Sequence, residues 1–359
     1  MFAPTVFSRR DPRDGAHIVH KQPESDIEID QARAALAACP VAAIRVETKA
    51  DRHHRGLDPP TPKDEILAPK LALNPKFNGL DMPFPRPIVY GTDNSNNKND
   101  GQDEDMVYHV GHHNENSFGG CPYLFSINSN GSNGNDDEKI WIMVDTPKYS
   151  KLAVRTIESL TGAGRGPDYL FLTHVDDTAD HNKWKEHYPN MKRIFHSGDL
   201  GRHNWLGDST LNDVEILLNG KSEDDPAVPL QLFTLDGSTV ASLDDVPDEK
   251  VLIVHTPGHS PGSISLWKRP TASDSPTYSK GVLFTGDTYS FTTRGGGHMS
   301  GFPRYGNNRQ QQSRVLPRLL DLEWQIVAPG HGHVRDYTTS EGSRREEEMQ
   351  PAIHELETY

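Results

Sequence analysis

The stretch YLFLTHVDDTADH (169–181) places an apolar run directly before two histidines and three aspartates. A short continuous apolar run is typical of a strand that is buried on both faces. Three later strands are expected to end in a similar way, at TPGH (256–259), TGD (285–287) and PGH (329–331). Because a side chain at a strand end is held rigidly at the edge of the core, these four ends predict a preorganised metal site.

The composition argues against several classes of binding partner. The chain has 359 residues, enough for one large domain and a small one, and its formal net charge is −14. This charge disfavours nucleic acid and anionic membranes, so we expect a small-molecule substrate and leave the oligomeric state open. The two cysteines, Cys39 and Cys121, cannot form a disulfide framework. We therefore expect a reducing compartment, the cytoplasm, with a plastid or another organelle as the alternative.

The chain divides into three regions by pattern. Residues 1–60 read as a small α/β domain, with a helix at 29–40 between strands at 17–23 and 42–48. Residues 61–106 are rich in proline, asparagine and acidic residues and are expected to be a linker. From 107 to 359, groups of strands with helices between them indicate an α+β domain of two packed sheets with helices outside.

The four strand ends, taken in order, resemble the metallo-β-lactamase superfamily, whose usual first motif is HxHxDH. That family implies an αββα sandwich with a dinuclear metal centre at one edge of the sheets. Under this resemblance His174 and His259 would bind the first ion. The second ion would be bound by Asp180, His181 and His331, and Asp287 would bridge the two ions.

One part of the motif departs from the family pattern. The residue two positions after His174 is Asp176 rather than histidine, and two extra residues precede the pair Asp180–His181. Asp176 is included among the expected ligands, with Asp177 as its competitor. Zinc is the expected metal for the two divalent ions, but the added carboxylate leaves iron or manganese open, since these harder ions favour oxygen ligands.

A second resemblance concerns the N-terminal domain. The stretch ALAACPVAAI (35–44) resembles the last cluster motif of bacterial-type ferredoxins, in which Cys-Pro ends a ligand set. The upstream cysteines that a cluster requires are absent, so Cys39 cannot hold one. We interpret residues 1–60 as a ferredoxin-like domain without cluster cysteines, the alternative being a helix and strand that merely contain Cys-Pro.

The resemblance implies a hydrolase in which a metal-bridging hydroxide attacks a small ester, thioester, lactone or β-lactam. Asp180 is the expected catalytic residue, because it would orient that hydroxide and relay its proton. Arg294, Arg304 and Tyr305 lie in a glycine-rich loop and are expected to bind substrate. The alternatives are a non-haem iron oxygenase or redox protein similar to the persulfide dioxygenases, and a non-catalytic metal-binding module. His112 and His113 are expected on a surface loop.

Overall fold

The structure is a computed structural model, and it describes residues 3, 5–9, 17–19, 21–39, 83–89, 106–128, 139–225, 227–270, 281–292, 297–337 and 344–359. The expected strand at 42–48, most of the expected linker and Arg294 lie outside these residues.

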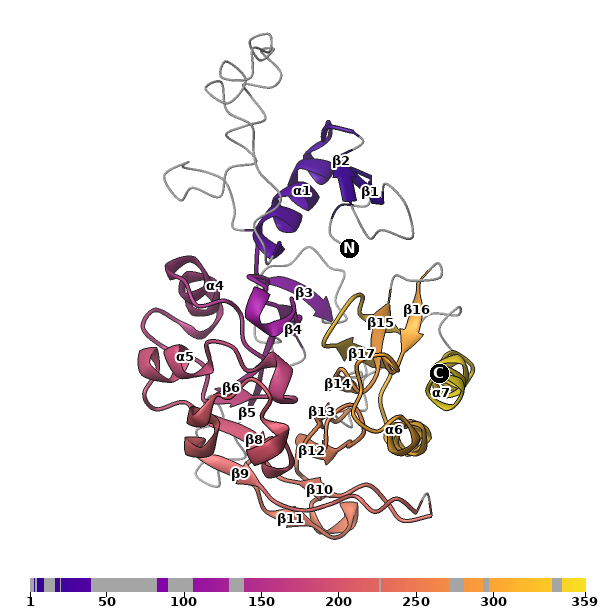
Figure 1. The fold of residues 1–359 in the computed structure, drawn as a ribbon. Coiled ribbons are helices and arrows are strands. Elements are labelled where there is room, and N and C mark those ends of the chain that lie inside the picture. The colour runs from indigo at the N-terminus through magenta and orange to yellow at the C-terminus, as the bar shows by residue number, and fades with distance from the viewer. Residues whose placement is uncertain are drawn as a thin grey trace.

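Two seven-stranded sheets form the centre of the molecule (Figure 1). The first sheet has the order β3-β4-β5-β6-β7-β8-β9, with strands Arg86–Val89, Val107–His109, Tyr123–Asn128, Lys139–Val144, Tyr169–Phe171, Lys192–His196 and Ile216–Leu218. The second has the order β11-β10-β12-β13-β14-β17-β18, with strands Thr239–Val240, Leu232–Phe233, Val251–His255, Ile264–Lys268, Val282–Gly286, Ile326–Pro329 and Arg335–Asp336. A separate hairpin pairs β15 (Ser290–Thr292) with β16 (His298–Ser300).

Helices cover the outer face of each sheet (Figure 1). Helices α4 (Lys151–Thr161) and α5 (His181–His187) pack on the first sheet through a cluster that includes Ile157 and Trp184. On the second sheet lie α6 (Arg309–Val315), a 3-10 helix (Leu316–Asp321) and α7 (Arg345–Thr358). A third cluster joins the inner faces of both sheets. The expected αββα sandwich is therefore confirmed.

Strand direction explains where the helices and the ligands lie. Strands β6, β7, β8 and β9 run parallel, and a parallel pair needs a crossover connection, which α4 and α5 supply for the first two pairs. In the second sheet β14 and β17 are parallel, and β12 has the same direction because both β12 and β14 are antiparallel to β13. The carboxyl ends of β12, β14 and β17 therefore meet at one edge.

The described part of the N-terminal region is a short hairpin and a helix. Strands β1 (Phe7–Arg9) and β2 (His17–Val19) are antiparallel, and α1 (Asp26–Ala38) begins at a capping box formed by Ser25 and Glu28. Ala34 and Ala38 of α1 pack on the buried ring of Phe84. The N-terminal helix is thereby fixed to the segment that leads into β3.

Strand β3 extends the sandwich beyond its expected limits. It lies within the expected linker, yet it pairs with β4 and forms an edge of the first sheet. The boundary expected at residue 107 therefore falls inside this sheet. Arg86 of β3 also forms an ion pair with Asp30 of α1, at 2.5 Å.

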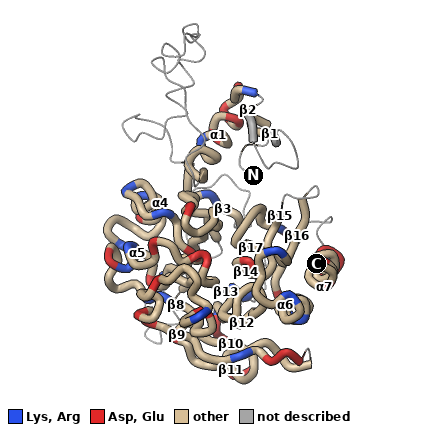
Figure 2. The backbone as a smooth tube through the Cα atoms, in the orientation of Figure 1, with Lys and Arg blue, Asp and Glu red and all other residues tan. Residues whose placement is uncertain are grey.

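Within the described residues, no helix is both long enough and apolar enough to cross a membrane. Among the outer helices, α6 carries basic residues and no acidic ones, whereas acidic residues prevail on α7 (Figure 2).

The two sheets approach each other closely at Gly286, the last residue of β14. Its φ is +47°, and a Cβ at this position would lie 2.6 Å from Thr173 Oγ1, in the segment after β7. Only glycine combines this backbone conformation with this separation at no steric cost. Thr173 directly precedes His174, so the contact sets the distance between two of the four strand ends.

We predict that Gly286→Ala lowers the free energy of unfolding by about 2–4 kcal/mol, since it adds a clash to an unfavourable φ. Gly164→Ala is the matched control, because Gly164 has a φ of +71° with open space around its Cβ position. The control should lose only about 1–2 kcal/mol. Urea denaturation would measure both values, and equal losses would contradict the close approach.

Candidate metal centre

The first strand end is held in place by a hydrogen-bond chain. Asp145 follows β6 and accepts hydrogen bonds from the backbone N–H of Thr173 at 2.8 Å and from the Thr173 hydroxyl at 3.1 Å. Because the Thr173 hydroxyl uses its hydrogen in the bond to Asp145, its oxygen accepts a hydrogen bond from Nδ1–H of His174, at 3.0 Å. Nε2 of His174 is left as the ring nitrogen with a lone pair, which is how a metal-binding histidine is oriented.

Four donor atoms converge on one point. Nε2 of His174 and Nε2 of His259 each lie close to the same two carboxylate oxygens, Oδ2 of Asp176 and Oδ2 of Asp287. The distances from His174 are 3.7 and 3.8 Å, and those from His259 are 3.8 and 3.6 Å. Ligands about 2.1 Å from a shared ion in a tetrahedron are roughly 3.4 Å apart, so a divalent ion fits with little movement.

The hydrogen bonding of the site also fits a metal. His174 and His259 are both 1% exposed, and Nε2 of His174 has no hydrogen-bond partner among the described residues. A buried polar atom without a partner is costly, and an ion bound there would remove that cost.

Charge at the centre favours a cation. Burial raises the pKa of Asp287, but the surrounding histidines His331, His259 and His174 outweigh it and hold the pKa below its usual value. The pKa of Asp176 is likewise lowered, because His259 and His174 outweigh the effect of burial. Burial lowers the pKa of His174 to about 4, so that its ring is neutral, as a ligand must be. Two carboxylates thus face two imidazoles in a buried site.

Asp287 faces a third histidine through its other oxygen. Nε2 of His331, at the end of β17, lies 3.6 Å from Oδ1 of Asp287. The His331 side chain is 24% exposed, so this side of Asp287 is the more open one. One oxygen of Asp287 therefore faces His174 and His259, and the other faces His331. The resemblance assigned this position to a bridging residue.

The structure does not bring Asp180, the expected ligand and catalytic residue, to the four converging donor atoms. Its Oδ2 accepts hydrogen bonds from Asn114 Nδ2 and from the backbone N–H of Tyr149, both at 3.0 Å. Its Oδ1 accepts from Lys183 Nζ at 2.6 Å. Both carboxylate oxygens are thus engaged with groups of the outer layer.

His181, also an expected ligand, is likewise not brought to these donor atoms. Its Nδ1 lies 3.1 Å from Nη1 of Arg193, and its Nε2 lies 3.1 Å from Oδ2 of Asp208. The physical reason is the spacing after His174. Val175–Asp177 coil into a 3-10 helix, which brings Asp176 to the centre and leaves His181 to begin α5 in the outer layer.

Asp176 and Asp177 lie on different sides of the His174 ring, and each belongs to a candidate donor group that includes His174. Asp176 is on the Nε2 side, whereas Oδ2 of Asp177 lies 3.9 Å from Nδ1. Asp177 is fully buried, and burial followed by the charge of Asp145 raises its pKa well above the usual range. No local sequence signal distinguishes the two aspartates.

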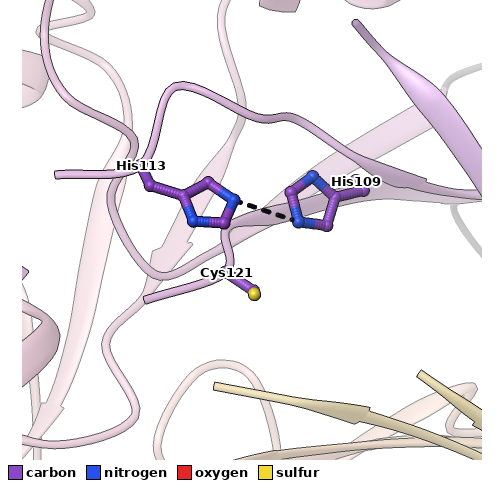
Figure 3. A group of neighbouring side chains, drawn as sticks. All are labelled: His109, His113 and Cys121. Atoms are coloured by element: carbon purple, nitrogen blue, oxygen red, sulfur yellow. Dashed lines mark hydrogen bonds between the residues drawn. The ribbon is translucent and has the colours of Figure 1, made fainter. Parts of the chain in front are cut away.

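A second group of donor atoms, which the sequence did not suggest, lies beside the centre (Figure 3). Nitrogen atoms of His109 and His113 and the sulfur of Cys121 lie within 4.8 Å of one another. His109 ends β4, His113 lies in the following loop and Cys121 precedes β5. The expectation that His112 and His113 lie on the surface is wrong, because His112 is 8% exposed and bonded to Thr156, and His113 is half-buried.

The hydrogen-bond directions show that the ring nitrogens of both histidines in this group have hydrogen-bond partners without a bound ion. The backbone N–H of Gly111 donates to Nδ1 of His109 at 3.0 Å, so Nε2 of His109 carries the proton. Nδ1 of His113 donates to the carbonyl of Gly119, which leaves Nε2 of His113 to accept from His109 at 3.3 Å. A metal on Nε2 of His109 would need a proton on Nδ1, facing the N–H of Gly111. Burial also raises the pKa of the Cys121 thiol to about 12.

Of the residues expected to bind substrate, Arg304 and Tyr305 lie on an exposed loop between β16 and α6. The guanidinium of Arg304 lies 5.7 Å from the centre of the Tyr305 ring.

One family model matches the N-terminal part of the chain. The family model described as the 4Fe-4S single cluster domain of Ferredoxin I matches residues 1–46. Cys39 is the only cysteine in that stretch. Among curated proteins, none matches this chain.

Several solved structures are similar to the sandwich. The DIM-1 metallo-β-lactamase is 18% identical over 66% of this chain and 93% of its own, with a TM-score of 0.40. A metallo-β-lactamase with a HARLDQ motif from Cronobacter sakazakii is 17% identical over 70% of this chain and 88% of its own, with a TM-score of 0.37. A metallo-β-lactamase from Erythrobacter litoralis is 9% identical over 70% of this chain and 93% of its own, with a TM-score of 0.37. No activity follows from similarity at this level.

The strand order and the His/Asp strand ends together form the αββα sandwich and the His/Asp donor group that the sequence motifs predicted. The N-terminal region of the chain is ferredoxin-like.

We predict that His174→Ala weakens metal binding at least 100-fold, because it removes a central donor atom. His181→Ala is the matched control, and it should retain the wild-type metal content because His181 is bonded to Arg193 and Asp208. Titration of the metal-depleted variants would measure both affinities. Loss of metal in the control would restore His181 as a ligand.

We predict that Cys121→Ser leaves the metal stoichiometry unchanged, since the hydrogen-bond directions around His109 oppose an ion there. Elemental analysis of the purified variant would measure this. Cobalt substitution of the wild type is a second readout, and it should give no thiolate-to-cobalt charge-transfer band. Such a band, or a lower metal content in the variant, would identify Cys121 as a ligand.

Proposed function

We propose that this chain is a metal-dependent hydrolase of a small ester, thioester, lactone or β-lactam. The observation that supports it is the buried Nε2 of His174, which has no hydrogen-bond partner among the described residues and faces Asp176 and Asp287. A site of this kind at the edge of two sheets matches what a metal hydrolase requires: a rigid donor set and an adjacent open side.

His174, His259 and Asp287 would hold the ion. A divalent ion in such a site acts as a Lewis acid and lowers the pKa of a bound water to about 7. With Asp176 beside the ion rather than bound to it, three protein donors leave a position for water or substrate, which catalytic sites require. Asp180 and His181, which the sequence suggested for a second ion, are bonded elsewhere. We therefore propose one firmly held ion rather than the two that the sequence suggested.

Asp176 takes the role that was expected of Asp180. Its Oδ1 accepts a hydrogen bond from Nε1 of Trp205 at 2.7 Å, which directs Oδ2 toward His174 and His259. Its lowered pKa keeps the carboxylate ionised at neutral pH, so Oδ2 can orient an attacking water and accept its proton.

A non-haem iron oxygenase is the second candidate. The set His174, His259 and Asp287 has the two-histidine, one-carboxylate composition that many iron(II) oxygenases use. The absence of Asp180 and His181 from the centre favours a single ion, as such an enzyme needs. Zinc, iron and manganese are all compatible with this donor set.

The test combines metal content with turnover. We expect removal of the metal to abolish hydrolysis of a panel of ester, thioester, lactone and β-lactam substrates, and zinc to restore it. Asp176→Asn should lower kcat by roughly 100-fold or more with metal retained, because it removes the proton acceptor.

Asp180→Asn is the matched control for this measurement and should leave kcat within a few-fold of the wild type. Iron as the metal purified with the protein, with oxygen consumption on persulfide and no hydrolysis, would replace the hydrolase by the oxygenase. Retained metal with neither activity would indicate a binding module.

A further inference from the structure

A cavity of about 400 Å³ lies between β16, the loop that follows it and the C-terminal end of α7. Its volume is within the range of small-molecule sites. The residues that matter for its chemistry are His298, Phe302, Arg304, Tyr305, Glu355 and Tyr359. These residues are not part of the metal-ligand set.

The cavity adjoins the metal centre through Phe302. The centre of the Phe302 ring lies 5.9 Å from that of His331, so one side chain contacts the ligand region and also lines the cavity. A group bound in the cavity would therefore lie beside the open side of Asp287.

The loop that forms this wall is fixed to the ligand segments at both ends. At one end Nε2 of Gln312 donates to the carbonyls of Gly301 and Thr288, at 2.8 and 2.9 Å. At the other end the backbone N–H of Asn307 donates to the carbonyl of His259, at 2.8 Å. Because Thr288 follows Asp287 directly, the wall is positioned relative to two of the donor residues.

The lining combines aromatic faces with one available positive charge. The rings of Phe302, Tyr305 and Tyr359 supply apolar surface. Among the described residues, no carboxylate forms an ion pair with Arg304, whose guanidinium lies over Tyr305. A bound carboxylate can therefore pair with this guanidinium through two parallel hydrogen bonds.

The side-chain carboxylate in the lining, that of Glu355, is already bonded. Oε1 of Glu355 lies 2.5 Å from Nε2 of His298, and Oε2 accepts from the Ser300 hydroxyl at 2.8 Å. Glu355 thus joins α7 to β16 and does not offset the charge of Arg304. The cavity as a whole suits an anionic ligand rather than a cationic one.

We propose that this cavity binds the part of the substrate that does not react, and that this part is an apolar group of aromatic size ending in a carboxylate. The proposal rests on the proposed hydrolase function, because it places the scissile group at the adjoining centre. Arg304 is the specificity-determining residue, and the aromatic rings bind the apolar body.

The experiment measures binding of 3-phenylpropionate and of its neutral amide, 3-phenylpropionamide, to the metal-loaded protein by calorimetry. We expect the acid to bind at least 10-fold more tightly than the amide. Arg304→Gln should remove this preference and leave amide binding unchanged. Arg344→Gln is the matched control, an exposed arginine before α7 that pairs with Glu347, and it should keep the preference. Equal affinities in the wild type, or a preference that survives in Arg304→Gln, would overturn the proposal.

A carboxylate could instead bind the metal directly, and His174→Ala separates the two cases. Retention of the preference in this metal-deficient variant supports the cavity, whereas its loss there together with survival in Arg304→Gln assigns the carboxylate to the metal. Failure of the hydrolase proposal gives a different pattern, in which the preference depends on Arg304 but no substrate is turned over.

Discussion

The central constraint on this protein is the meeting of two carboxylates and two imidazoles in a buried site. Asp176 and Asp287 each place an oxygen less than 4 Å from the same two histidine nitrogens, on His174 and His259. Removing such charges from water is costly unless an opposite charge compensates. The four side chains therefore form a site that a bound cation would stabilise. The rest of the sandwich holds these side chains together.

The scaffold meets this constraint by joining the two sheets at the site. Besides the close approach at Gly286, the backbone N–H of Ile264 donates to the carbonyl of Thr173, and that of Cys121 donates to the carbonyl of Gly330. Each hydrogen bond links a segment of one sheet to a segment of the other next to a ligand residue. A donor set drawn from both sheets is stable only if the sheets cannot slide, and these contacts oppose sliding.

Much of the fold and part of the site could be predicted from the sequence. Apolar runs that stop at Thr-Pro-Gly-His or Gly-Asp identify buried strands and their ends, because both signals are local. The position of Asp180 and His181 could not be predicted, since it depends on whether the residues after His174 continue extended or coil. Their side chains then bond to Asn114, Arg193 and Asp208, which are distant in sequence. The burial of His112 was missed for a similar reason, because it requires Phe84 and Thr156 to pack beside it.

The packing of α1 on Phe84 gives the ferredoxin-like region a purpose that needs no iron–sulfur cluster. The ring of Phe84 lies 5.3 Å from that of His109, and its edge fills the space next to Gly111, where a Cβ would lie 2.3 Å away. The far face of Phe84 is covered by alanines of the helix. The helix and Phe84 thus cover His109, which is buried beside the metal centre. This contact depends on the small side chains of the helix and on the ring of Phe84, and it involves none of the thiolates that an iron–sulfur cluster would need.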